Sequence, residues 1–158
     1  MPHTLAQLAL LMPLVAAGSP AAPPSAVAFG ATVEATRAEL AKRCDRLDVR
    51  ALDPAALPIA QESHLQLDCH GFEHAGAARL AEFVFADDAL AFVWVLTEAA
   101  EEAALRDQLI DAFGDPSHET PEFIAFVDHR VALRRDKPEL LYYGAAVAPL
   151  YEAWFDAR

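Results

Sequence analysis

The chain has 158 residues, of which 24 are Asp or Glu and 12 are Lys or Arg, so its formal net charge is -12. Hydrophobic residues make up 54% of it, which is enough for a packed core in one compact domain and too much for a disordered chain. The acid excess disfavours a surface that neutralises nucleic-acid phosphates, and it equally disfavours a polybasic membrane anchor.

The first 28 residues contain no Asp, Glu, Lys or Arg. An apolar run at 5–15 is followed by small residues and prolines, which is the layout of a secretory signal peptide. Small residues in the required places allow cleavage after Ala17 or after Ala28. The apolar run is shorter than the roughly 20 residues that span a bilayer. We therefore expect a signal peptide at 1–28 and a single exported domain at 29–158, the alternative being a buried or disordered Ala-rich arm.

Both cysteines, Cys44 and Cys69, lie in the expected exported domain. Two cysteines in an exported chain usually pair, and closing a loop of about 25 residues stabilises a fold by roughly 3 kcal/mol in the chain-entropy model. We expect a Cys44–Cys69 disulfide, with two buried free thiols as the alternative. No C-x-x-C motif is present, so a thioredoxin-like role is not indicated.

The first expected helix follows Thr32, whose side chain can cap it, and its apolar residues from Val33 to Leu47 fall along one face. Residues 48–63 contain two prolines and are expected to form a connector. From His64 onward apolar and polar residues alternate, which predicts a half-buried strand.

Two more strands are expected at 80–85 and 90–96, joined by a turn at Asp87-Asp88. Residues 90–96 are apolar on both faces, so this strand should lie inside a sheet that is covered on two sides. A second helix is then expected, capped by Thr97 and ended by Gly114.

The last third of the chain repeats this pattern. Three short strands are expected, at 123–127, 131–135 and 139–143. Apolar residues at 147, 150, 151 and 154 then predict a closing amphipathic helix. The order α-βββ-α-βββ-α indicates an antiparallel meander with helices packed on it, which is the α+β class.

Residues 70–74 read H-G-F-E-H and match the H-x-x-E-H pattern, in which two histidines on a helix bind zinc and the glutamate acts as a base. The preceding strand and the glycine disfavour a helix, and in a strand both histidines point to one face and the glutamate to the other. We therefore expect a polar hairpin end, and neither a metal nor another cofactor. The alternative is a metal site at His64, His70 and His74, or a metal-dependent hydrolase using His70, Glu73 and His74.

No other pattern indicates catalysis, and we expect no catalytic residue. Ser63 and Ser117 are each followed by a histidine, but adjacency along the chain does not give the geometry of an activated nucleophile. The sequence has no phosphate-binding glycine-rich loop.

A basic cluster stands out in this acidic chain. One stretch, at 130–143, contains Arg130, Arg134, Arg135, Tyr142 and Tyr143. Arginine and tyrosine are favoured at protein interfaces, so these five residues form the candidate interface. The alternative is a set of edge-strand charges that prevent aggregation.

Two segments carry a resemblance to a group of proteins. They are Ala-Phe-Gly-Asp-Pro at 112–116, with the strands that follow it to Tyr143, and Phe-Gly-Ala-Thr at 29–32, which opens into a helix. This pattern resembles small exported bacterial proteins of unknown function, and the duplicated layout is similar to β-lactamase-inhibitor-like and outer-membrane-assembly accessory folds. The resemblance carries over no catalytic residue and implies a non-enzymatic protein of the cell envelope.

We therefore expect a periplasmic or secreted binding protein whose acidic charge steers a basic protein or peptide partner in the cell envelope. An inhibitor or immunity function is one form of this hypothesis. No nucleic-acid partner and no membrane anchor after processing are expected, and the sequence leaves the oligomeric state open.

Overall fold

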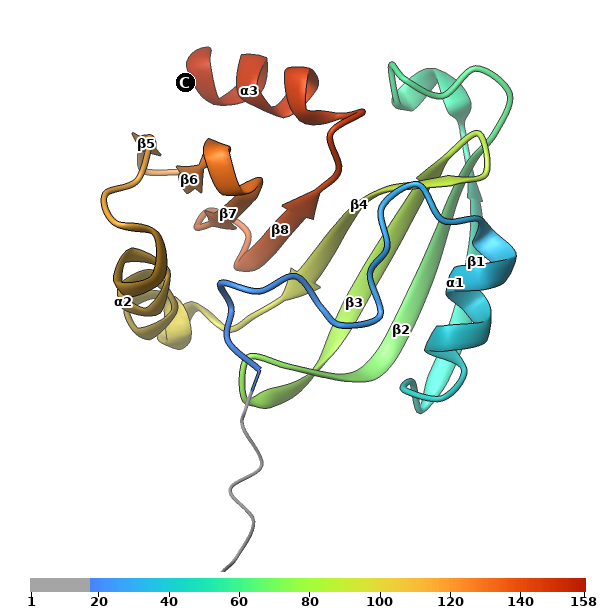
Figure 1. The fold of residues 1–158 in the computed structure, drawn as a ribbon, viewed down its shortest axis with the longest axis horizontal. Helices are drawn as coiled ribbons and strands as arrows, with labels where there is room; N and C mark the ends of the chain where they lie inside the picture. The colour runs from blue at the N-terminus through green and yellow to red at the C-terminus, as the bar shows by residue number, and fades with distance from the viewer. Residues whose placement is uncertain (1–17) are drawn as a thin grey trace, which may run out of the picture.

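The computed structural model describes residues 18–158, so most of the expected signal peptide, at 1–17, lies outside the described residues. Residues 18–158 form an α+β domain with one antiparallel sheet (Figure 1). Its helices are α1 (Val33–Leu40), α2 (Glu102–Phe113) and α3 (Ala148–Asp156). Its strands are β1 (Arg46–Leu52), β2 (His64–His74), β3 (Ala77–Ala86), β4 (Ala89–Leu96), β5 (His118–Glu119), β6 (Phe123–Phe126), β7 (Val131–Arg134) and β8 (Glu139–Tyr143). Three short 3-10 turns are η1 (Pro54–Ala56), η2 (Ala99–Glu101) and η3 (Val127–His129).

The eight strands lie in the order β1-β2-β3-β4-β8-β7-β6-β5. Each half of the chain contains a helix followed by a four-stranded meander, α3 follows the second meander, and the halves meet where β4 pairs antiparallel with β8. The expected α+β meander is confirmed, but each half has four strands where three were expected. The added strands are β1 and the two-residue β5, which is too short to leave a periodic signal.

The course of the chain after α1 differs from the expectation. The helix ends at Leu40, whereas the pattern suggested that it continues to Leu47, and residues 46–52 form β1 where the end of a helix and a connector were expected. In this segment Leu47 and Val49 alternate with charged residues, which suits an edge strand. All seven residues of β1 pair with β2, and this long-range pairing overrides the local helical pattern.

The start of the second helix is also corrected. The Thr97 N–H donates to the Pro138 carbonyl at 2.9 Å, so Thr97 ties the end of β4 to the neighbouring loop and does not cap a helix. The turn η2 precedes α2, and the Glu101 carboxylate accepts the Glu98 N–H at 2.8 Å. The end of α2 is as expected, with Gly114 at its carboxyl cap and a φ of 80° that favours glycine.

The sheet carries a core on each face. On the first face, called here the α1/α2 face, residues such as Leu67, Phe83 and Val93 pack under both helices and under residues 18–31. On the opposite face, called the α3 face, Phe92 and Tyr143 pack under α3. The expectation that 90–96 is an inner strand is confirmed, since β4 lies between β3 and β8. Its Val93 and Phe92 are buried in the cores of the two faces, but Trp94 stays partly exposed on the α3 face.

A β-bulge in β2 separates residues that the sequence placed together. The register with β3 shifts between Cys69 and Phe72, and Gly71 adopts a φ of 75°. A Cβ on residue 71 would collide with the Asp45 carboxylate, so the bulge requires glycine. His70 consequently faces the α3 side, whereas Phe72 returns to the core of the α1/α2 face. The expectation that one strand face holds both histidines of the H-x-x-E-H pattern is therefore wrong.

The expected disulfide is confirmed. Cys44, in the loop after α1, is bonded to Cys69 of β2, with their Cα atoms 5.3 Å apart. The bond ties α1 to the sheet that it covers.

Candidate binding cleft

A cleft opens on the α3 face between α3 and the segment that carries η1. Both elements lie at the same end of the long strands in Figure 1. The cleft has a volume of about 310 Å³ and its floor is formed by Phe92 and Trp94 of β4. Leu57, Tyr151 and Trp154 line its walls. The cleft lies between these two segments, which are far apart in the sequence and both pack against β4.

The amphipathic pattern of α3 builds one wall. Phe155 is fully buried on the sheet, while Tyr151 and Trp154 beside it stay partly exposed. The Tyr151 ring meets the Phe92 ring edge-on, with centroids 5.5 Å apart, and meets the Trp94 ring in the same way at 6.2 Å. Such edge-to-face contacts hold aromatic rings in defined orientations, so the apolar wall is preformed.

Arg134 of β7 lies between the two tryptophans. Its guanidinium carbon is 5.9 Å from the ring centroid of Trp94 and 5.9 Å from that of Trp154. Its Nε donates to Asp136 at 2.7 Å and its Nη1 donates to Glu139 at 3.0 Å. These carboxylates raise the pKa of Arg134 further above its ordinary value, so the group stays cationic. Arg134 is therefore a fixed part of the cleft wall, held by cation–π contacts and ion pairs.

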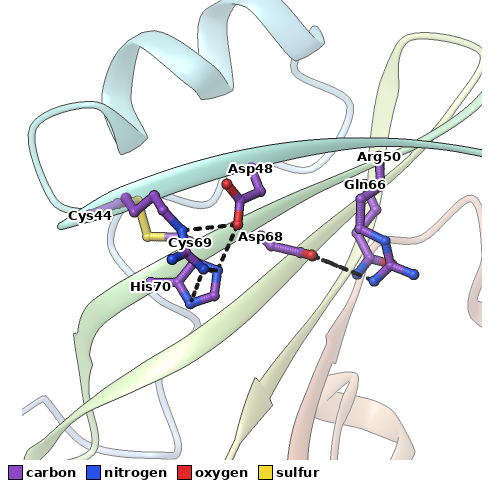
Figure 2. A network of polar contacts seen from close by, with 8 residues as sticks. Cys44, Asp48, Arg50, Gln66, Asp68, Cys69 and His70 are labelled. Atoms are coloured by element: carbon purple, nitrogen blue, oxygen red, sulfur yellow. Dashed lines mark hydrogen bonds and ion pairs between the residues drawn. A yellow bond between two sulfur atoms is a disulfide. The ribbon is translucent and has the colours of Figure 1, made fainter.

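Polar side chains continue the α3 face beyond the cleft, over β1, β2 and β3. The pairing of strands places Glu82 beside Trp94 and Asp68 beside Glu82. Gln66 donates to Asp68 at 2.6 Å, and Arg50 donates to the same carboxylate at 3.5 Å (Figure 2). Burial raises the pKa of Glu82, an effect that nearby Lys137 opposes. Among residues 18–158 no helix covers this part of the sheet, so the cleft opens onto a polar surface.

The histidines of the expected polar hairpin lie apart. His70 contacts Asp48 at 3.0 Å on the α3 side, as Figure 2 shows, and His64 contacts the Asp53 carbonyl at 3.0 Å. His74 lies in the opposite core, 2.7 Å from the Tyr142 hydroxyl. Residues 18–158 contain no group of three His, Cys, Asp or Glu side chains arranged to hold a metal ion. The alternative of a metal site at His64, His70 and His74 therefore has no geometric support.

The five residues of the candidate interface do not share one surface. Tyr142 and Tyr143 are 1% and 0% exposed and point to opposite faces, because successive residues of an inner strand alternate. Arg135 is held by Glu102 of α2 at 2.8 Å. Arg130 lines a different hollow, of about 440 Å³, together with Phe29 and several alanines and glycines. Only Arg134 reaches the aromatic cleft.

Sequence reasoning did not identify the floor of the cleft. Trp94 was assigned to a covered strand face, although it remains partly exposed. A usable signal existed in the composition, since the chain has only two tryptophans and both line this cleft. The larger hollow beside Arg130 has fewer groups that favour recognition, so the aromatic cleft is the stronger candidate.

No protein-family model, curated protein or solved structure matches this chain. Within residues 18–158 no helix is both long enough and apolar enough to cross a membrane.

Proposed function

We propose that this chain is an exported, non-enzymatic binding protein that holds an apolar side chain of a basic protein or peptide partner in the aromatic cleft. One observation carries the proposal: Trp94, Trp154, Tyr151 and Arg134 converge on a single open concavity. Tryptophan, tyrosine and arginine are the residue types that contribute most to binding energy at protein interfaces. A preformed apolar wall loses little conformational entropy when a partner binds.

The charge of the molecule favours a basic partner. All charged side chains lie beyond residue 28, so the whole net charge of -12 belongs to the folded domain. Close to the cleft, Glu82 pairs with Trp94 of its floor, and Asp68, one strand further away, is buried and bound by Arg50. An acidic surface raises the rate of encounter with a cationic segment, and this effect weakens as salt screens the charges.

Export rests on two separate features. The first is the charge-free N-terminal region with an apolar run and small residues, which has the layout of a signal peptide. The second is the Cys44–Cys69 disulfide, since disulfides persist in oxidising compartments such as the periplasm. Together they support a periplasmic or secreted location.

The emission of the two tryptophans gives a direct test, because both line the cleft. The oxidised protein is titrated with a library of Lys- and Arg-rich decapeptides that carry one central apolar residue. A library in which Asp and Glu replace the basic residues is the comparison. We expect a saturable emission change with the basic library that weakens with added salt. Equal responses to the two libraries, or no response to either, would contradict the proposal.

A pair of variants locates the binding. Ala56 lies on the rim of the cleft and is exposed, so Ala56→Arg should obstruct the cleft and repel a basic ligand without disturbing the core. We expect at least a tenfold rise in Kd, which corresponds to about 1.4 kcal/mol. Ala55→Arg is the matched control, because Ala55 is exposed on the same turn and does not line the cleft. Equal weakening by both variants would place the binding elsewhere.

A further inference from the structure

The segment before α1 is built into the folded domain. Residues 18–31, called here the N-terminal strap, run along the sheet from the side of α2 to the start of α1 (blue in Figure 1). Ala21, Ala26 and Val27 pack against the core of the α1/α2 face. The strap therefore fills the space between the two helices that cover this face.

Polar contacts fix the early part of the strap. The Tyr142 hydroxyl donates to the Pro20 carbonyl at 2.7 Å, and both groups are buried. Pro24 is also buried, and its carbonyl accepts the Val27 N–H at 2.8 Å. Arg43, which follows α1, donates to the Ser25 hydroxyl at 3.1 Å. A domain that began at Phe29 would lose all of these contacts, and the Tyr142 hydroxyl would lose its acceptor in the core.

The later part of the strap is held independently of the earlier part. The Gly30 N–H donates to the Leu90 carbonyl at 2.8 Å, and the Leu90 N–H donates to Ala31 at 2.9 Å. Phe29 lies so close to Gly144 that a Cβ on residue 144 would come within 3.0 Å of it. Removal of residues 18–28 would thus leave an attached strap end and an uncovered strip of core.

We infer that a signal peptidase removes residues 1–17 and that the mature protein begins at Gly18. Cleavage hydrolyses the Ala17–Gly18 peptide bond with one water molecule, leaving a carboxylate on Ala17 and a new amino terminus on Gly18. Of the two sequence-allowed bonds, this is the one whose cleavage retains every core contact of the strap. The inference rests on the export that is part of the proposed function.

Intact-mass measurement of the full chain, expressed with its own N-terminus in a bacterium and recovered separately from periplasm and cytoplasm, tests the inference. We expect a periplasmic product that lacks 17 residues and two hydrogen atoms, the latter because the disulfide forms. A periplasmic product that begins at Phe29, or one that keeps its leader, overturns the cleavage site while leaving export intact. An unprocessed chain confined to the cytoplasm overturns export itself, and the inference with it.

Two substitutions identify the cleaved bond without relying on the stability of the mature protein. Signal peptidases require a small residue immediately before the bond, so Ala17→Tyr should reduce processing at least tenfold. Ala28→Tyr is the matched control, because Ala28 is exposed and precedes the competing bond. It should be processed as the unaltered chain is. The opposite outcome, with Ala28→Tyr blocked and Ala17→Tyr processed, assigns the cleavage to the second bond and overturns the inference.

Discussion

At the scale of single residues, the Tyr142 hydroxyl joins three distant parts of the chain. It donates to the Pro20 carbonyl of the strap and lies 2.7 Å from His74 Nε2. Because its proton goes to Pro20, the hydroxyl accepts from His74, which places the histidine proton on Nε2. Burial lowers the pKa of His74 to about 4, with Arg79 adding to the effect, so the ring is neutral in the folded protein.

Tyr142→Phe should destabilise the protein by about 2 kcal/mol, since a buried donor and a buried acceptor both lose their partner. Tyr143→Phe is the matched control: the adjacent hydroxyl is also buried and has no hydrogen-bond partner among the described residues. Its removal should change the free energy of unfolding by less than about 0.5 kcal/mol. Chemical denaturation of both variants measures the difference. A loss of stability in Tyr142→Phe no larger than that in Tyr143→Phe would contradict this prediction.

The sequence predicted that arginine and tyrosine side chains form a binding surface, but it did not predict which of them lie at the surface. Of the five residues of the candidate interface only Arg134 lines the cleft, and the tyrosine that lines it is Tyr151, which was not among the five. The side chains of Tyr142 and Tyr143 were expected at a surface, but β8 is an inner strand with both faces covered. Which strand lies inside a sheet depends on pairing between the two halves, and local sequence does not encode that pairing.

At the scale of elements, the Cys44–Cys69 disulfide and strand β1 hold the same region of the chain against β2. The turn after α1 carries Cys44, and β1 begins two residues later beside the bulged end of β2. The bond holds this turn against Cys69 in the neighbouring strand. The presence of two cysteines in a chain expected to be exported predicted the bond correctly, whereas the helical pattern predicted to continue to Leu47 was wrong. A short amphipathic segment is compatible with both the helical and the strand periodicity. Pairing with β2 determines that this one is a strand.

Removing the disulfide tests its contribution. The Cys44→Ala/Cys69→Ala double variant should lower the free energy of unfolding by about 3 kcal/mol, because the unfolded chain regains the entropy of a 25-residue loop. Urea denaturation of this variant, and of the unaltered protein with and without reductant, measures the loss. The reduced protein and the double variant should agree. A loss below about 1 kcal/mol would mean that the pairing of β1 with β2 holds this region without the bond.

At the scale of the whole molecule, the two halves differ in what covers them. On the α1/α2 face, α1 covers strands of the first half and α2 covers strands of the second half. On the opposite face the helix α3 packs on the second-half strands and on the neighbouring β4. The first half instead presents Arg50, Asp68 and Glu82 on that face. The cleft lies where the part of the sheet covered by α3 meets the part that no helix of residues 18–158 covers. At this border Trp94, Tyr151 and Trp154 stay partly exposed.

Acid should weaken the contact that joins the halves. The ordinary pKa of histidine is 6.5 and that of His74 in the folded protein is about 4, so between these values the unfolded chain binds more protons than the folded one. The contribution of His74 is therefore complete above pH 6.5 and is lost as the pH falls toward 4. Chemical denaturation at a series of pH values should show stability decreasing in this window.

His74→Gln identifies the source of that pH dependence. Glutamine keeps a donor for the Tyr142 hydroxyl and does not titrate, so the decrease in stability between pH 6.5 and 4 should become smaller. His129→Gln, at an exposed position, removes a histidine without touching this contact and should leave the decrease unchanged. An unchanged decrease in His74→Gln would assign the effect to other groups.

The sequence by itself determined the α+β class, the strands from His64 to Tyr143 apart from β5, the helix capped by Gly114 and the Cys44–Cys69 bond. These follow from local periodicity, turn chemistry and cysteine chemistry, which neighbouring residues encode. Only the tertiary structure decided that β4 pairs with β8, that 46–52 is a strand, and that Trp94 and Trp154 face one cleft. Each of these depends on contacts between segments far apart in the chain. Their free energy comes from pairing and burial, and no short window of sequence contains both partners.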